Sequence, residues 1–249
     1  MSTVMATEWH IGCSGFHYKE WKDEFYPKGL AQKNWFSYYA TQFNTLELNV
    51  TFYRFPQLKT LENWFDKAPD GFSFSAKVPR TITHYKKFVD TEAMVREFYD
   101  VLRAGLRDKL ACVLFQLPPQ LAYSEEKLEK IISQTDPSFN NVIEFRNEGW
   151  WRPDVMKRLA KHGISFSGVS FPKISADEAV VNVKALSYYR FHGVPKLFYS
   201  EYDHAFLEKI YHQLKAAKPK RAYLYFNNTA SLAALHNARY FGELVAGDQ

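Results

Sequence analysis

The chain has 249 residues, of which 46% are hydrophobic and 24% are charged, so a large core and a hydrophilic surface are both available. Its formal net charge of +5 favours anionic partners only mildly and is too small to indicate nucleic acid by itself. The sequence has no run of about 20 apolar residues, which excludes a membrane-spanning helix and predicts no membrane partner.

Cysteine usage and the first residues predict a cytoplasmic protein. Cys13 and Cys112 lie in separate apolar runs, which is typical of a reducing compartment and argues against a disulfide framework or a structural zinc site. The stretch MSTVMATEWH has no basic start followed by an apolar segment, so we expect no signal peptide. Aromatic residues reach 17%, which favours a thick aromatic core over a stacking surface for sugars or bases.

Short β-rich runs alternate with helical patterns along the chain. The predicted strands are 10–15, 45–49, 73–78, 112–117, 141–147, 164–170, 188–193 and 222–228. The predicted helices are 33–43, 57–67, 91–107, 124–135, 153–162, 203–217 and 230–246. Ser124 and Pro153 stand where an N-cap and a first-turn proline are expected. Segment 171–187 fits either a poor helix or a long loop with a small strand.

Strand–helix alternation repeated about eight times predicts a parallel β/α architecture. A closed barrel suits eight units in a chain of this length. An open doubly wound sheet normally has a glycine-rich phosphate loop after its first strand, and the turn CSGFHYKEW lacks one. We therefore predict an α/β fold, a single (β/α)8 TIM-type barrel that is irregular around its sixth and seventh strands. It forms one domain over 1–249, with 1–8 as a flexible N-terminus.

Most predicted strands begin apolar and end in polar side chains at alternate positions, which would all point into the barrel. These residues are Glu47, Asn49, Lys77, Gln116, Glu144, Arg146, Arg190, His192, Asn227 and Asn228. Because the carboxyl ends of barrel strands open onto one mouth, we expect these side chains to converge there. A ligand site is the favoured interpretation, and a structural ion-pair network that plugs the barrel is the alternative.

The charges at this mouth favour an anionic ligand. Lys77, Arg146 and Arg190 outnumber the two glutamates, and arginine suits phosphate or carboxylate. The segment FNNTASLAAL starts a helix after the last strand, where free backbone N–H groups hold anions. No cofactor is predicted.

A divalent metal is disfavoured because it requires several carboxylates and few competing cations. The only metal site that the strand ends offer combines Glu47, Glu144 and His192.

Two carboxylates at one mouth also suggest acid–base chemistry. Arg146 follows Glu144 by two residues and Arg190 is expected to approach it, so a depressed pKa and an ionised nucleophile, base or charge anchor are expected. Glu47 has no cation near it in the sequence and is the predicted proton donor, with His192 as the alternative.

Loops near the mouth add aromatic and basic residues, about half of which are expected to serve packing alone. These residues are His17, Tyr18, Trp21, Tyr53, Arg54, Arg80, His84, Trp150 and Trp151. Of them, we predict that His17, Tyr53 and Trp150 bind substrate. Asn237, on the apolar side of the last helix, is expected to be a structural hydrogen bonder.

Several motifs together resemble the YecE-like family, also called domain of unknown function 72. They are IGCSGFHYKEWKDEFYP, FNTLELNVTFYRFP, FSAKVPRTITH, VLFQLPP, VIEFRNEGWW, YYRFHG, and YLYFNN followed by HNAR. The resemblance extends over about residues 9–243 and implies a TIM-type barrel with no agreed reaction. The family's fifth-strand motif commonly ends in a histidine where this chain has Asn147.

These patterns predict an uncharacterised barrel protein that binds a phosphate-bearing or other anionic small molecule. Hydrolase or lyase chemistry through Glu47, Glu144 and His192 is favoured over a purely binding role. A nucleic-acid binding or processing barrel is the first alternative, and a glycosidase-like hydrolase that uses the two glutamates is the second. The oligomeric state is left open.

Overall fold

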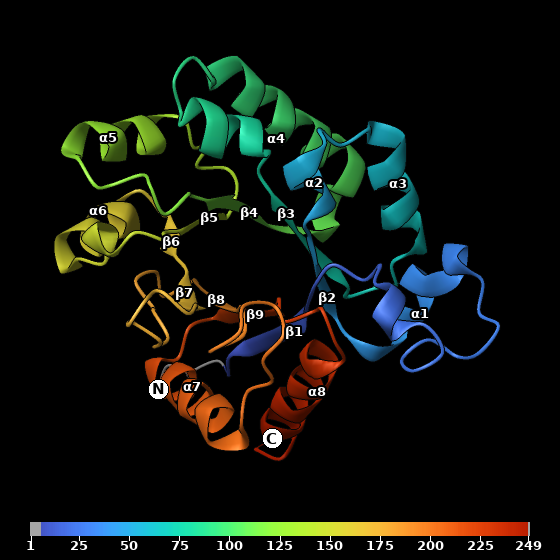
Figure 1. The fold of residues 1–249 in the computed structure, drawn as a ribbon. Helices are drawn as coiled ribbons and strands as arrows, with labels where there is room; N and C mark the ends of the chain where they lie inside the picture. The colour runs from blue at the N-terminus through green and yellow to red at the C-terminus, as the bar shows by residue number, and fades with distance from the viewer. Residues whose placement is uncertain (1–5, 249) are drawn as a thin grey trace, which may run out of the picture.

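A computed structural model describes residues 6–248 and has parallel strands inside a layer of helices (Figure 1). The strands are β1 (Glu8–Ser14), β2 (Thr45–Leu48), β3 (Ser73–Lys77), β4 (Leu110–Gln116), β5 (Asn141–Glu144), β6 (Ser165–Phe166), β7 (Gly168–Ser170), β8 (Leu186–Phe191) and β9 (Arg221–Phe226). The longer helices are α1 (Trp35–Gln42), α3 (Leu58–Lys67), α4 (Glu92–Leu106), α5 (Glu125–Ser133), α6 (Pro153–Lys161), α7 (His204–Ala217) and α8 (Ala233–Ala246). A short helix, α2 (Val50–Tyr53), follows β2.

All pairings between these strands are parallel, in the order β6-β5-β4-β3-β2-β1-β9-β8-β7. Because β6 and β7 are separated only by Ser167, the two ends of this order are halves of one strand, and the sheet curls into a nearly closed barrel. The predicted TIM-type barrel is confirmed.

The irregularity predicted around the sixth and seventh strands lies at this β6/β7 seam. The Ser167 amide still bonds to the Ile143 carbonyl of β5 (2.9 Å), while the Ser165 hydroxyl reaches across to the Leu186 carbonyl of β8 (3.2 Å). From 171 to 185 the chain forms a loop with isolated bridges at Phe171–Ile174 and Val183–Leu186. The loop interpretation of this segment is therefore the correct one.

The first strand begins two residues earlier than the predicted strand 10–15. β1 already begins at Glu8, whose amide bonds to the Lys220 carbonyl (2.9 Å), and the Thr7 hydroxyl donates to Pro219. Residues 1–5 of the predicted flexible terminus lie outside the described part of the chain. Within residues 6–248, no helix has the length and apolar character needed to cross a bilayer.

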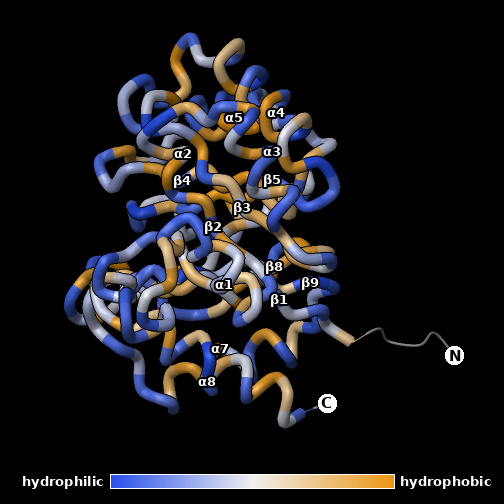
Figure 2. Tube along the Cα trace, turned by 90° about the vertical axis from the view of Figure 1, so that its right-hand side faces the viewer, coloured by the Kyte–Doolittle hydropathy of each residue, from blue (hydrophilic) through white to orange (hydrophobic). Residues whose placement is uncertain are grey.

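Strand alternation divides the hydrophobic residues into two layers. Outward-facing side chains such as Phe191 and Phe226, which stack with ring centroids 4.3 Å apart, pack against Phe241 of α8. The outer helices alternate hydrophobic and hydrophilic residues around each turn, as Figure 2 shows for α7 and α8. The inward set includes Tyr225, whose hydroxyl bonds to Thr45 and Ser75 (2.6 and 2.8 Å).

β1 and β2 approach each other closely at Gly12. The Tyr39 hydroxyl of α1 lies between these strands, accepting from the Cys13 amide (2.7 Å) and donating to the Thr45 carbonyl (3.0 Å). A Cβ atom on Gly12 would lie 2.1 Å from that carbonyl oxygen, so only glycine fits here. This junction fixes the register that places Ser14 beside Glu47 at the mouth.

Candidate functional site

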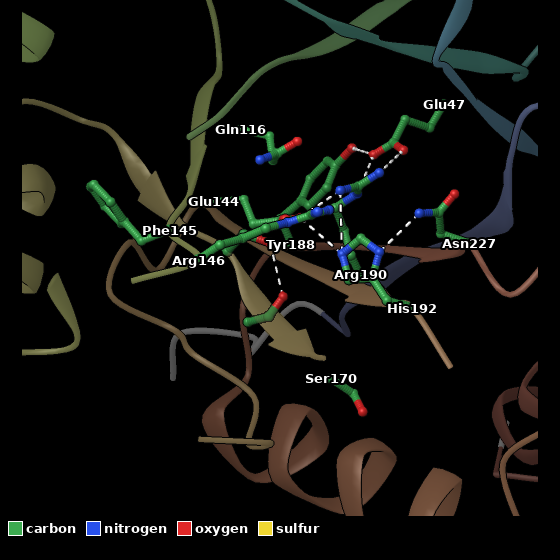
Figure 3. Close-up of polar contacts among 12 residues, drawn as sticks. Glu47, Gln116, Glu144, Phe145, Arg146, Ser170, Tyr188, Arg190, His192 and Asn227 are labelled. Carbon is green, nitrogen blue, oxygen red and sulfur yellow. Dashed lines mark hydrogen bonds and ion pairs between the residues drawn. The ribbon is translucent and has the colours of Figure 1, made fainter. Parts of the chain in front are cut away.

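Arg190 is a fully buried guanidinium that two fully buried carboxylates share at the carboxyl end of the barrel (Figure 3). Its Nε and Nη2 donate to Glu47 Oε2 (2.8 Å) and Oε1 (2.6 Å), and its Nη1 donates to Glu144 Oε2 (2.5 Å). Arg190 belongs to β8, whereas Glu47 belongs to β2 and Glu144 to β5. The site therefore joins strands that lie on opposite sides of the β6/β7 seam.

Glu47 is held in its ionised form. Burial by itself would raise the pKa of this carboxyl, but the charge and hydrogen bonds of Arg190 outweigh burial and lower it. The Tyr188 hydroxyl donates a further bond to Oε2 (2.7 Å). Glu47 has no cation near it in the sequence, but the folded barrel supplies Arg190, and the lowered pKa does not favour the predicted role of proton donor. Arg190 is 143 positions away along the chain, and only closure of the barrel brings it to Glu47.

Glu144 is ionised as expected. Burial opposes its charge, but Arg190, Arg146 and His192 together hold its pKa well below the usual range. Arg146 donates from Nε to Oε1 (2.7 Å), so the two residues of the strand-end motif do pair with each other. Arg190 approaches as predicted and binds the second oxygen.

A chain of directed hydrogen bonds connects His192 to the rest of the mouth. Asn49 Nδ2 donates to Asn227 Oδ1 (3.4 Å), and Asn227 Nδ2 lies 2.8 Å from His192 Nδ1. His192 Nε2 lies 3.2 Å from Glu144 Oε2. With the proton on Nε2, each of these three contacts has one donor and one acceptor, and Arg190 Nη1, 3.4 Å from the same nitrogen, donates to Glu144 instead. Burial lowers the pKa of His192 to about 3, so the ring is neutral at pH 7.

Lys77 ends β3 and is only 7% exposed. Its Nζ lies 4.0 Å from the centre of the Phe52 ring, and among residues 6–248 it forms neither an ion pair nor a hydrogen bond. Burial and the charges of Arg190 and Arg146 lower its pKa well below the usual range, more than Glu144 and Glu47 raise it.

His84 and Gln116 lie on the same side of the site as Lys77. The His84 ring packs edge-on against Phe52 (4.9 Å), and its Nε2 is 3.4 Å from Gln116 Nε2. Burial and the neighbouring Lys77 and Arg146 charges lower the pKa of His84 to about 4. Gln116 donates mainly to the Leu117 carbonyl (2.7 Å), which fixes its amide at the edge of the cluster.

A cavity of about 320 Å³ opens beside Glu47. It is lined by Gly15, Phe16, His17, Tyr18, Glu47, Leu48, Asn49, Val50, Tyr53 and Trp64. Three predicted site residues, His17, Asn49 and Tyr53, therefore share one cavity with a carboxylate of the cluster. The Asn49 Oδ1 atom is buried there and has no partner among the described residues.

Two predicted binding residues point away from the mouth. Trp150 is fully buried, stacks on Phe145 (4.4 Å) and donates its indole N–H to the Leu121 carbonyl (2.7 Å). Phe145 has the opposite strand parity to Glu144 and points outward, which places Trp150 in the helical layer (Figure 3). The indole of Trp150 therefore does not face the mouth, and its contact with substrate stays a prediction.

Asn228 has a structural position as well. Its amide donates to the Ser200 carbonyl (2.9 Å) and to Asn237 Oδ1 (3.0 Å), whereas its neighbour Asn227 faces the barrel interior. Asn237 also bonds to the amide and carbonyl of Tyr202, which confirms its predicted structural role.

Sequence reasoning overlooked Tyr188, Phe52 and Trp64. Tyr188 shares the strand parity of Arg190 and His192, so the alternation rule applied one step earlier would have found it. Phe52 follows β2 by four residues and precedes Tyr53, so the same strand end that indicated Tyr53 could have indicated it. Trp64 lies in α3, and no sequence signal places it near a strand end.

Residues 6–248 contain no group of three or more His, Cys, Asp or Glu side chains arranged to hold a metal ion. The space between the two glutamates, where a shared metal would have to lie, is taken by the Arg190 guanidinium.

The fold and this cluster define an α/β-barrel protein with a buried ion network at the carboxyl ends of its strands. A family model described as "Protein of unknown function DUF72" matches residues 10–249, and the chain belongs to this family. This confirms the resemblance seen in the motifs.

One curated relative and two solved structures are similar to this chain. UPF0759 protein YunF of Bacillus subtilis (strain 168) is 26% identical over 138 residues, 53% of this chain and about half (49%) of the relative. A crystal structure of a DUF72 family protein from Thermotoga maritima MSB8 has a TM-score of 0.85 and 25% identity, covering 96% of this chain and 99% of the other. One from Enterococcus faecalis V583 has a TM-score of 0.79 and 19% identity, covering 96% and 98%.

Proposed function

We propose that this protein binds a small organic anion at the carboxyl-terminal mouth of its barrel and acts on it as a hydrolase or lyase. The supporting observation is the balance of charge: Arg146 and Arg190 pair with both carboxylates, and Lys77 lies beside them without a carboxylate of its own. The arginines already bind both carboxylates. Protonating Lys77 therefore leaves one positive charge that only a ligand balances, because a buried charge is costly without a partner.

Arg146 is the proposed anchor for the anion. Only its Nε is used by Glu144, and its terminal nitrogens have no hydrogen-bond partner among residues 6–248. The guanidinium lies over the Phe171 ring (4.7 Å), and its side chain keeps 14% of its surface exposed. A planar fork with two free N–H edges suits a phosphate or carboxylate group. Lys77 supplies the second contact once the anion favours its protonated form.

Proton transfer is proposed for Glu144 and His192. Glu144 is an ionised carboxylate beside the anchor, so it serves as a base, and His192 Nε2 keeps it oriented. Glu47, bound on both oxygens by Arg190, positions that guanidinium. The glycosidase alternative needs one carboxylic acid with a raised pKa, whereas both pKa values are lowered here. The cytoplasmic location predicted from the sequence remains a prediction.

Arg146→Met is expected to weaken the binding of inorganic phosphate or pyrophosphate at least tenfold, because the free guanidinium edge is lost. Isothermal titration calorimetry of wild type and variant at pH 7 and low salt measures this change. Glu144 keeps its contacts to Arg190 and His192, so the variant is expected to fold.

Arg152→Met is the matched control, because Arg152 also pairs with a nearby acid, Asp154, but on the exposed surface. It should leave binding unchanged. Equal phosphate affinity in wild type and Arg146→Met would contradict the proposal.

Single-stranded nucleic acid is the second candidate ligand, because of one arrangement at the rim. The Arg80 guanidinium lies 5.5 Å from the Tyr53 ring and 5.4 Å from the Tyr85 ring, and these tyrosines are 67% and 65% exposed. Exposed aromatic rings with a cation between them suit stacked bases and a phosphate.

This candidate predicts that a labelled oligothymidylate binds with an affinity that falls steeply between 50 and 200 mM salt. It also predicts that Arg80→Met weakens binding several-fold, as fluorescence anisotropy would measure. Affinity independent of salt and of Arg80 would rule out this candidate.

A further inference from the structure

The side chain of Lys77 has an environment that the anion-binding role does not require. Its Nζ lies against the Phe52 ring at the carboxyl end of β3, with no carboxylate within ion-pair distance among residues 6–248. In most buried lysines the ammonium is stabilised by a paired carboxylate. Here Arg190 and Arg146 bind the neighbouring carboxylates, so the amine is left without a counter-ion.

Four charged side chains and one histidine act on the amine of Lys77. Arg146 and Arg190 disfavour its protonation, Glu47 and Glu144 favour it, and His84 is neutral at pH 7. The two arginines neutralise the two glutamates, so the cluster has no net charge when Lys77 is an uncharged amine. A desolvated lysine next to other cations is the arrangement that activates amine nucleophiles.

We propose that Lys77 is an amine nucleophile that forms a Schiff base with a carbonyl substrate bearing a carboxylate or phosphate group. This inference rests on the proposed function for the anionic group, which Arg146 would hold beside the amine. The substrate class is a 2-oxo acid or a phosphorylated aldehyde or ketone. Lyase chemistry next to the carbonyl follows, because the iminium withdraws electrons from the adjacent carbon.

The step balances in atoms and charge. The Nζ lone pair forms a bond to the carbonyl carbon, and the carbonyl π electrons move to oxygen. That oxygen takes one proton from the amine and one from solvent, and it leaves as water. The iminium that remains carries one positive charge, which the anionic group of the substrate neutralises inside the cluster.

Reductive trapping of the folded wild-type protein with glyoxylate and sodium cyanoborohydride tests this inference. Glyoxylate is a small anionic aldehyde, and hydride transfer to its imine leaves a stable carboxymethyl group on the lysine. Peptide mass spectrometry then ranks the lysines by their rate of modification. Lys77 is expected to react at least tenfold faster at pH 7 than exposed lysines such as Lys184.

The pH dependence separates an activated amine from simple accessibility. An ordinary lysine loses about tenfold in reactive amine for each pH unit below its pKa of about 10.4. Labelling of Lys77, corrected for the intrinsic reactivity of glyoxylate with a model amine, should therefore change little between pH 8 and pH 7. Labelling of a free lysine derivative measured in parallel should fall about tenfold before that correction.

Lys109 is a matched internal control. Its Nζ also lies over a phenylalanine ring, that of Phe65 (4.8 Å), but it donates hydrogen bonds to the Phe65 and Ala68 carbonyls. It is expected to react slowly at pH 7. Lys77→Met should remove the fast adduct and leave the other lysines unchanged.

Modification of Lys77 at or below the rate of Lys184 in the folded wild type would overturn the inference. Phosphate binding reports on the proposed function separately. If phosphate binds through Arg146 while Lys77 stays unmodified, only the Schiff-base role fails. If Lys77 reacts rapidly but Arg146→Met changes neither phosphate binding nor labelling, the proposed anion site at Arg146 is contradicted. The nucleophilic role of Lys77 is then still supported.

Discussion

Arg190→Met is expected to lower the free energy of unfolding by about 3–5 kcal/mol, because it leaves two fully buried carboxylates without their cation. Methionine keeps much of the side-chain volume, so loss of charge and hydrogen bonds dominates the effect. Glu47 loses both arginine contacts and keeps only the Tyr188 hydroxyl, whereas Glu144 keeps Arg146 and His192. The pKa of Glu47 should therefore rise more than that of Glu144.

Urea unfolding followed by circular dichroism at pH 7 measures this loss. Adding Glu47→Gln to Arg190→Met should recover a large part of it, because the buried carboxylate that is left with fewer partners is then no longer charged. A surface control, Arg152→Met, should change stability little. If Arg190→Met unfolds at the urea concentration of the wild type, the buried network does not stabilise the barrel.

The stability of the protein is expected to fall as the pH drops from 7 to 5, mainly because of His192. Its pKa is about 3 in the folded protein and about 6.5 in the unfolded chain. Between these two pH values the unfolded chain binds a proton at His192 and the folded protein does not. The stabilisation is complete above about pH 6.5 and is lost progressively toward pH 3, at roughly 1.4 kcal/mol per pH unit. Below about pH 4.5 the lowered pKa values of Glu47 and Glu144 add a second loss.

Urea titrations at pH 7, 6 and 5 for wild type and His192→Gln measure the contribution of the ring. In the variant, the free energy of unfolding should fall less steeply as the pH drops, because about one proton fewer is taken up on unfolding. The slope that remains includes the contribution of His84, whose pKa is also lowered. His212→Gln, on the exposed side of α7, is the control and should follow the wild type. If the free energy of unfolding falls equally steeply with pH in wild type and in His192→Gln, His192 does not take part in acid destabilisation.

Trp150 and Asn228 lie away from the mouth for the same physical reason. Both residues follow a strand end closely in the sequence, but neither lies in a strand: Trp150 packs in the hydrophobic core, and Asn228 bonds to Ser200 and Asn237. Strand alternation gives the correct side only while the residue remains in the strand. β5 ends at Glu144 and β9 at Phe226, so residues beyond them follow the loop and the helices that it contacts.

Glu47 shows the other limit of sequence reasoning. Its inward orientation follows from alternation with Leu46 and Leu48, which the sequence displays directly. Its protonation state depends on Arg190, and the pairing requires that β2 and β8 face each other across the barrel. A local pattern records which side of a strand a residue occupies, but it does not record which strand lies opposite.

By itself, the sequence determined the strand–helix alternation, the barrel class, the irregular 171–187 region and the inward set of polar side chains. These features follow from backbone periodicity and from the burial of alternate residues, which are properties of short segments. Only the tertiary structure decided that Arg190 bridges Glu47 and Glu144, and that Lys77 is left without a carboxylate. Electrostatic energies depend on distances across the closed barrel, and closure brings together charges that lie more than a hundred residues apart along the chain.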